Sequence, residues 1–189
     1  MGKRSRDDSD DEEEGPTKRF RHQNCTSAQP RAIIKVYVDG SFWKKENGER
    51  TKNMHCKCKR RAGYGIYFPE SKRKNKRYYG RCPQKVQKSS DAEFYAITQA
   101  IRWFRTNDTR LHIFTDCLTA VNVSKQYQVW LNEQHKRKVH VETLFEEMQS
   151  CKYLPKLSFV RGHSGDAGNN KADKLARKGM RKGCEGKCV

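Results

Sequence analysis

Ala-Ile-Ile-Lys-Val-Tyr-Val-Asp, at positions 32–39, has the composition of a β-strand and is followed by Gly40. β-Branched and aromatic side chains pack well on a pleated surface, and the glycine marks the end of the run. Two further runs of strand character follow at residues 63–68 and 77–80. Three strands this close together in the sequence predict an antiparallel meander.

Beyond residue 90 the apolar residues recur with a helical period. Ala92, Ala96, Ala100 and Phe104 lie four apart, which predicts a helix with one buried face. The short apolar run at residues 111–116 fits a central parallel strand. A last strand is predicted at 157–161, and further helices at about 118–126, 139–150 and 169–182. The sequence thus predicts an α/β fold: a mixed five-stranded sheet, with an antiparallel meander first and parallel strands after it, flanked by helices.

The net charge of +19 is unevenly distributed along the 189 residues. Residues 1–30 contain six Lys and Arg against seven Asp and Glu, which leaves 35 against 15, or +20, for residues 31–189. A folded body this basic repels itself unless it works near a polyanion, and nucleic acid is the expected one. A membrane fits less well, because the sequence shows no basic amphipathic helix and no apolar run long enough to span a bilayer.

The chain is predicted to consist of a disordered charged tail (1–30), a folded domain (31–182) and a short C-terminal tail (183–189). The acidic run of the first tail has a basic cluster on each side, at residues 3–6 and 18–21. Such a segment buries too little apolar surface to offset its ordering entropy. The clusters resemble a nuclear-import signal, with a merely solubilising tail as the equal alternative. No signal-peptide segment is visible, so an intracellular, nuclear protein is expected.

Eight cysteines occur with no Cys-x-x-Cys pair among them. In an intracellular protein we expect them to be mostly free thiols. A zinc site built from residues 55–58 with Cys184 and Cys188 is the alternative, but the spacing is poor for a structural site.

Four acidic residues stand at positions where a globular protein rarely places charge. Asp39 and Asp116 end apolar strands, Glu93 lies in the alanine-rich helix, and Asp173 lies in the last helix. Any one of them alone is more simply a cap or a solvated side chain. Together they are costly to bury unless they bind a metal, and the carboxyl ends of strands in an α/β sheet open into one crevice. The set therefore predicts a site for divalent cations with oxygen ligands.

Four motifs occur in order along the chain: Tyr-Val-Asp-Gly-Ser at 37–41, Ala92-Glu93, Phe-Thr-Asp at 114–116, and Gly-His-Ser-Gly-Asp-Ala-Gly-Asn-Asn-Lys-Ala-Asp at 162–173. This series resembles that of the type-1 ribonuclease H family, over about residues 33–180. The resemblance implies the ribonuclease H-like fold and an endonuclease that cuts the RNA strand of an RNA–DNA hybrid, leaving 5′-phosphate and 3′-hydroxyl ends.

The resemblance also implies a role for each matched side chain. Asp39 would bridge two Mg2+ ions, with Mn2+ as the possible substitute. Glu93 and Asp116 would complete one metal site, and Asp173 would join Asp39 at the other. His163 would assist protonation or product release on the leaving side, which suits a side chain that titrates near neutrality.

The substrate contacts are also predicted by resemblance. Backbone groups near Gly40 and Ser41, and the segment Gln87-Lys88-Ser89-Ser90, would read the 2′-hydroxyls of the RNA strand. Tyr127 and Trp130 stand where the family places its DNA-side aromatics, and core packing is the equal alternative for Trp130. The basic run at 135–138 is either a shortened basic handle or a generic attraction for phosphate.

The sequence departs from the family pattern at a few places. Serines 89 and 90 stand where many relatives have Asn, Asn170 where Glu is usual, and Cys117 where Ser is usual. The basic insertion at residues 44–61 is long and either extends the binding surface or is a solvated loop. An inactive hybrid-binding module and a fold-related DNA nuclease are the alternative functions. The complete carboxylate set favours an active enzyme, and we expect a monomer without an obligate protein partner.

Overall fold

The computed structural model describes residues 29–44, 60–70, 78–132 and 138–182. The predicted disordered tail up to residue 28, residues 45–59 of the basic insertion, residues 135–137 of the basic run and the C-terminal tail lie outside these ranges. So do the cysteines proposed as the alternative zinc ligands. Within the described ranges, Cys82, Cys117 and Cys151 are free thiols, as predicted.

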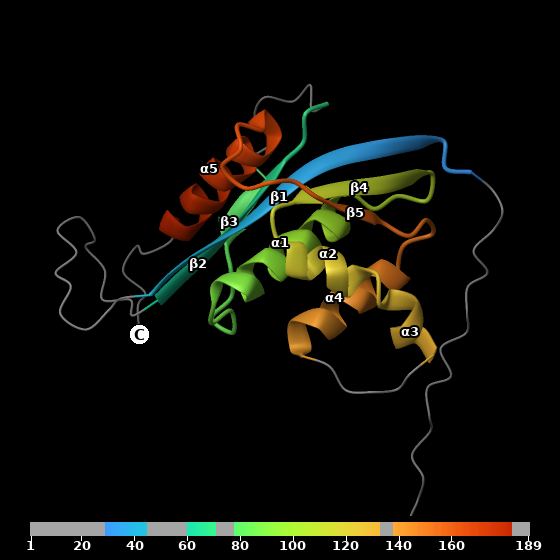
Figure 1. Cartoon of the computed structure of the whole chain (residues 1–189), viewed down its shortest axis with the longest axis horizontal. Coiled ribbons are helices and arrows are strands. Elements are labelled where there is room, and N and C mark those ends of the chain that lie inside the picture. The colour runs from blue at the N-terminus through green and yellow to red at the C-terminus, as the bar shows by residue number, and fades with distance from the viewer. Residues whose placement is uncertain (1–28, 45–59, 71–77, 133–137, 183–189) are drawn as a thin grey trace, which may run out of the picture.

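Five strands form one mixed sheet with the spatial order β3-β2-β1-β4-β5, shown in Figure 1. β1 pairs antiparallel with β2 and β2 with β3, whereas β1–β4 and β4–β5 are parallel. The prediction of an α/β fold with an antiparallel meander followed by parallel strands is confirmed. The strands are β1 (Ala32–Lys44), β2 (Arg60–Tyr67), β3 (Tyr79–Arg81), β4 (Thr109–Thr115) and β5 (Lys156–Phe159).

Helices cover both faces of this sheet (Figure 1). One face carries α1 (Ser89–Phe104), α2 (Leu118–Ser124), α3 (Tyr127–Asn132) and α4 (Val139–Gln149), and the other carries α5 (Ala167–Arg181). The main core lies between the sheet and α1 and α4, where Val36, Ile97 and Phe145 have no exposed surface. Within the described ranges, no helix combines the length and the hydropathy needed to cross a bilayer.

The first strand is longer than the sequence indicated. We predicted that it ends at Asp39, but β1 continues to Lys44, because β2 pairs with it from Tyr37↔Tyr67 as far as Lys44↔Arg60. Asp39 therefore lies inside a strand, and this prediction was wrong. Lys44, Arg60 and Arg61, which we assigned to the insertion, belong to the two strands of this hairpin.

Helix α5 lies almost directly on the backbone of β2. A Cβ atom at Gly63 would stand 2.0 Å from the amide nitrogen of Met180, and one at Gly65 would stand 2.3 Å from that of Ala176. A Cβ at Gly179 would in turn stand 2.3 Å from the carbonyl oxygen of Gly80. Glycine at these positions lets the helix and the sheet approach more closely than side chains would permit.

Candidate active site

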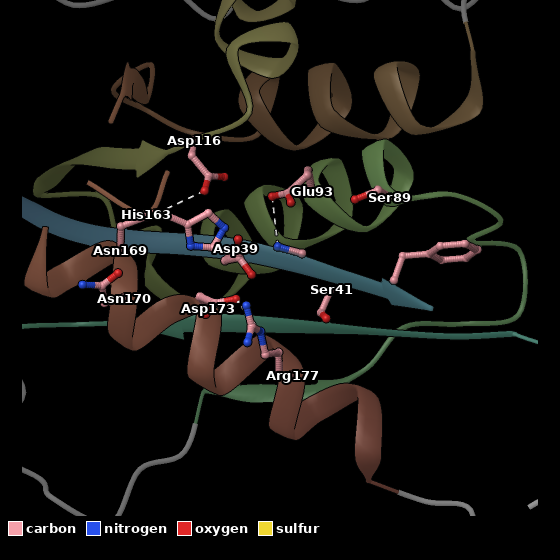
Figure 2. Close-up of a pocket in the computed structure, with 12 residues that line it drawn as sticks. Asp39, Ser41, Ser89, Glu93, Asp116, His163, Asn169, Asn170, Asp173 and Arg177 are labelled. Carbon is pink, nitrogen blue, oxygen red and sulfur yellow. Dashed lines mark hydrogen bonds and ion pairs between the residues drawn. The ribbon is translucent and has the colours of Figure 1, made fainter. Parts of the chain in front are cut away.

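Three carboxylates meet where the parallel pairing of β1 and β4 stops. This pairing ends at Tyr37↔Phe114, and an aspartate stands two residues after each of these partners: Asp39 within β1 and Asp116 just after β4. Helix α1 adds Glu93 from the face of the sheet that it covers. Oxygen atoms of these three side chains lie within 4.8 Å of one another, and Figure 2 shows the groups pointing toward a common centre.

Glu93 is held in place by the backbone of Gly40. A Cβ at residue 40 would stand 2.3 Å from the amide nitrogen of Glu93, so glycine lets α1 rest against β1. The buried N–H of Gly40 then donates a hydrogen bond of 2.9 Å to Oε2 of Glu93. The N–H of Gly40 thus serves this carboxylate, and Gly40 also lines the pocket, so its contact with nucleic acid stays a prediction.

The cluster is electrostatically strained without a cation. Asp39 is 7% exposed, and its burial, followed by repulsion from Asp116 and Asp173, raises its pKa to about 8. Burial, followed by repulsion from Asp39 and Asp116, raises the pKa of Glu93 to about 9, although the Gly40 hydrogen bond opposes the shift. Buried carboxylates that repel one another are a donor set that fits a hard divalent cation.

This strain predicts that a cation-free protein is stabilised by neutralising the cluster. The pKa of Asp39 rises from 3.8 to about 8 on folding, so between these values the folded state holds a proton that the unfolded state has lost. Stability therefore falls as the pH rises through this window. In EDTA at pH 7, Asp39→Asn should therefore stabilise the protein and raise its Tm by several degrees. Near pH 4 the gain should vanish, and an equal or lower Tm at pH 7 would contradict the predicted strain.

The fourth carboxylate lines the same pocket but has a partner of its own. Asp173 accepts an ion pair of 2.9 Å from Nε of Arg177, one helical turn further along α5. Figure 2 shows both side chains beneath Asp39. Asp173 therefore stands beside the three-carboxylate cluster with a guanidinium as its counter-ion. The sequence reasoning missed Arg177, although its position four residues after an acid was a signal for an ion pair.

His163 reaches the pocket from the loop between β5 and α5. It has a φ of 54°, an uncommon conformation for a residue with a side chain, so the surrounding loop holds it there. The preceding glycine explains the loop's position, because a Cβ at Gly162 would stand 2.7 Å from Oδ2 of Asp116. The loop thus brings His163 to the pocket by passing directly over Asp116.

Asn169 was not predicted, and it contacts the cluster. Its side chain is 3% exposed, and Nδ2 donates a hydrogen bond of 3.2 Å to Oδ2 of Asp116. Its backbone N–H donates to the N-cap carboxylate of Asp166 at 2.8 Å, which fixes the first turn of α5. The buried Oδ1 has no hydrogen-bond partner in the described part of the chain. An amide on the same helix face as Ala172 and Ala176 was the signal in the sequence, because that face is apolar and buried.

Some of the residues predicted to bind the substrate line the pocket, and others do not. Ser41 and Ser89 line the pocket, which has a volume of about 270 Å³, and Ser90 is not among its lining residues. Tyr127 is only 6% exposed and packs against Phe145, so its ring is not available to a DNA strand in this conformation. Trp130 packs against the same core and donates from Nε1 to Glu142 at 3.0 Å.

A mixed sheet in this strand order, with acids gathered beside the end of β4, is the arrangement of a ribonuclease H-like domain. The sequence model of RNase H matches residues 31–181. The chain is 30% identical over 161 residues to Ribonuclease H1 of Homo sapiens, a match covering 79% of this chain and 50% of that protein. The chain belongs to the ribonuclease H family.

Solved structures show the same fold. A type 1 RNase H, LC9-RNase H1, has a TM-score of 0.55 and 19% identity, covering 82% of this chain and 74% of that chain. The RNase H domain of PFV has a TM-score of 0.56 and 19% identity, covering 78% and 93%. A foamy viral protease-reverse transcriptase, solved with dsDNA, has a TM-score of 0.55 and 17% identity, covering 78% and 93%. The chain spans half the length of the human relative, so the match concerns this domain.

Proposed function

We propose that the chain is an endoribonuclease that cleaves the RNA strand of RNA–DNA hybrids by hydrolysis and leaves 5′-phosphate and 3′-hydroxyl ends. The observation that carries this proposal is the group of three carboxylates, Asp39, Glu93 and Asp116, within 4.8 Å in an open polar pocket. Membership of the family and the likeness to a human protein named Ribonuclease H1 support the choice of substrate.

Each of these residues of the pocket would have its own role in the hydrolysis. Two divalent cations, magnesium or manganese, would supply an activated water and neutralise the leaving oxygen when bound. Asp39, Glu93 and Asp116 would hold one, and Asp39 with Asp173 the other. Asp173 has to exchange its bond to Arg177 for that role. His163 would assist protonation or product release on the leaving side, from the loop above Asp116.

Substrate selection would rest on hydroxyl groups that flank the cluster. Ser41 follows Asp39 on β1 and Ser89 begins α1, and both line the pocket, where hydroxyls can meet the 2′-hydroxyls of RNA. Ser90 and Trp130 stay predictions for the same surface. A fold-related DNA nuclease is the second candidate, because the fold alone does not determine which strand is cut. An inactive hybrid-binding module is the third.

Cleavage of four duplexes, each labelled on one strand, tests the proposal. The substrates are RNA–DNA, RNA–RNA, DNA–DNA, and DNA with one embedded ribonucleotide, each with and without magnesium. We expect magnesium-dependent cutting of the RNA–DNA hybrid alone. Cutting of DNA–DNA would make the chain a DNA nuclease, and tight hybrid binding without cutting would make it a binding module.

Asn169 is expected to position Asp116 for its work. Replacing it with Ala removes the bond of 3.2 Å to Oδ2 of Asp116 and frees that carboxylate to rotate. Loss of a group that orients a ligand lowers activity or metal affinity by about 10–100-fold. Cleavage should fall by that factor, and manganese binding followed by calorimetry should weaken. Asn170→Ala, on the same turn of α5, is the control; an equal loss there would contradict a specific role for Asn169.

We also propose that the protein acts as a monomer in the nucleus. The basic clusters at 3–6 and 18–21 support the location, and both lie outside the described residues. A fluorescent fusion that stays cytoplasmic until a known import signal is added would contradict the nuclear location.

Light scattering of the purified chain measures the oligomeric state, and the mass of a dimer would contradict the proposed monomer.

A further inference from the structure

The exposed face of α5 is strongly cationic. Six basic residues lie within twelve positions of this helix and its C-cap, and all of them are exposed: Lys171, Lys174, Arg177, Lys178, Arg181 and Lys182. At 100° per residue they occupy one continuous side of the helix, opposite the buried positions Ala172, Ala176 and Gly179. Asp173 is the sole acidic residue of α5.

Almost none of this charge is neutralised within the described part of the chain. Asp173 forms its ion pair with Arg177, and no other α5 cation there has a carboxylate ion-pair partner. Three of the lysines lie against tyrosine rings of the sheet instead. The Nζ atom of Lys171 stands 4.5 Å from the ring centre of Tyr67, and those of Lys178 and Lys182 stand 5.5 and 5.0 Å from the ring of Tyr79.

The spacing of these cations is unfavourable for the isolated helix. Lys174 and Lys178 lie four residues apart, as do Lys178 and Lys182, and Arg177 and Arg181, and like charges at this spacing repel. The favourable interaction of the last turn with the helix dipole offsets part of this cost, but it does not extend to Lys171 and Lys174. Such a face is stabilised when a polyanion lies along it.

The face is continuous with the pocket. Arg177 lines the pocket beside Asp39 and Asp173, and the other cations continue from it around and along the helix. From Lys171 to Lys182 the helix rises about 16 Å. A strand that leaves the pocket over Arg177 therefore meets several cations, over a length that is enough to contact more than one of its phosphates.

We propose that the basic face of α5 binds the phosphate backbone of the nucleic acid where it extends beyond the cleavage site. The partner is the same hybrid that occupies the pocket, so this inference rests on the proposed function. The contact is to phosphates and reads no sequence. Its role is to add affinity and to hold the hybrid in one direction across the pocket.

Salt-dependent binding of a labelled hybrid of about two helical turns tests the inference. The full chain is titrated by fluorescence anisotropy in EDTA, which prevents cleavage. The variant is the triple change Lys174→Gln, Lys178→Gln and Arg181→Gln, which leaves the pocket residue Arg177 in place. The matched control removes three exposed cations at the opposite ends of the parallel strands: Arg110→Gln, Lys152→Gln and Lys156→Gln.

Neutralising three phosphate contacts should reduce the slope of log affinity against log salt by about two to three, and lower the affinity at low salt at least about tenfold. The control triple should change the slope much less. Equal changes in the two triples would show that net charge alone acts, and an unchanged slope in the α5 triple would also overturn the inference. Circular dichroism checks that both variants keep the fold. A wild type that binds the hybrid without cutting it overturns the proposed function and leaves this surface standing.

Discussion

Asp116→Asn is expected to abolish cleavage, with a loss on the order of 10³-fold or more, while the protein stays folded and still binds the hybrid. Asparagine has the shape of aspartate, and its own carbonyl oxygen can accept the bond that Nδ2 of Asn169 donates at 3.2 Å. The substitution therefore removes a negative charge from the cluster and little else. A cation that needs three converging carboxylates loses one of its ligands.

The measurement is cleavage of the RNA–DNA hybrid beside hybrid affinity and Tm. Asp108→Asn is the matched control, because it makes the same chemical change in an exposed residue just before the other end of β4. We expect wild-type cleavage from the control. If Asp116→Asn retained more than about a tenth of wild-type activity, the carboxylate cluster would not be the catalytic centre. Raised manganese that restores cutting would locate the defect in cation binding rather than in folding.

The mixed sheet and the converging acids could be predicted because both leave local signals. A run such as Ala32–Asp39 is strand-like by composition, and acids after apolar runs are conspicuous. The length of β1 left no such signal. Residues 40–44 are polar, glycine-containing and aromatic, and they become strand through pairing with Arg60–Tyr64, a contact across the insertion. Long-range pairing of this kind overrides local propensity.

The contacts within the site could not be predicted from the sequence, because they join residues that lie far apart along the chain. The pairing of Asp116 with Asn169 joins residues 53 positions apart, and so does that of Gly40 with Glu93. The spacing along the sequence shows that Tyr127 follows the third acid, Asp116. It does not predict that the ring of Tyr127 packs inward against Phe145. Arg177 is the opposite case: it lies four residues after Asp173 on one helix, and this local spacing alone indicates the ion pair.

Gly65→Ala should damage stability and catalysis together, because Gly65 lies across the sheet from Asp39 in the β1–β2 register. A Cβ there would stand 2.3 Å from the amide nitrogen of Ala176 and 2.4 Å from the carbonyl oxygen of Ala172, both backbone atoms of α5. These atoms cannot rotate away, so the helix itself has to move. Overpacking of this kind costs about 3 kcal/mol or more, which lowers Tm by roughly 6–12 °C.

The turn of α5 that moves is the turn that carries Asp173, which lies directly after Ala172. Displacing it from β2 also displaces Asp173 from Asp39, so cleavage should fall more steeply than the folded fraction at the assay temperature. Gly80→Ala is the control, because the nearest atoms to its new methyl group would be the ring and hydroxyl of Tyr64 at 3.0 Å, and not backbone atoms of α5. A Gly65→Ala protein with wild-type Tm and activity would mean that α5 does not rest on β2 through this glycine. A lower Tm with full activity per folded molecule would instead separate the helix position from catalysis, and Asp173 would then not need its place beside Asp39.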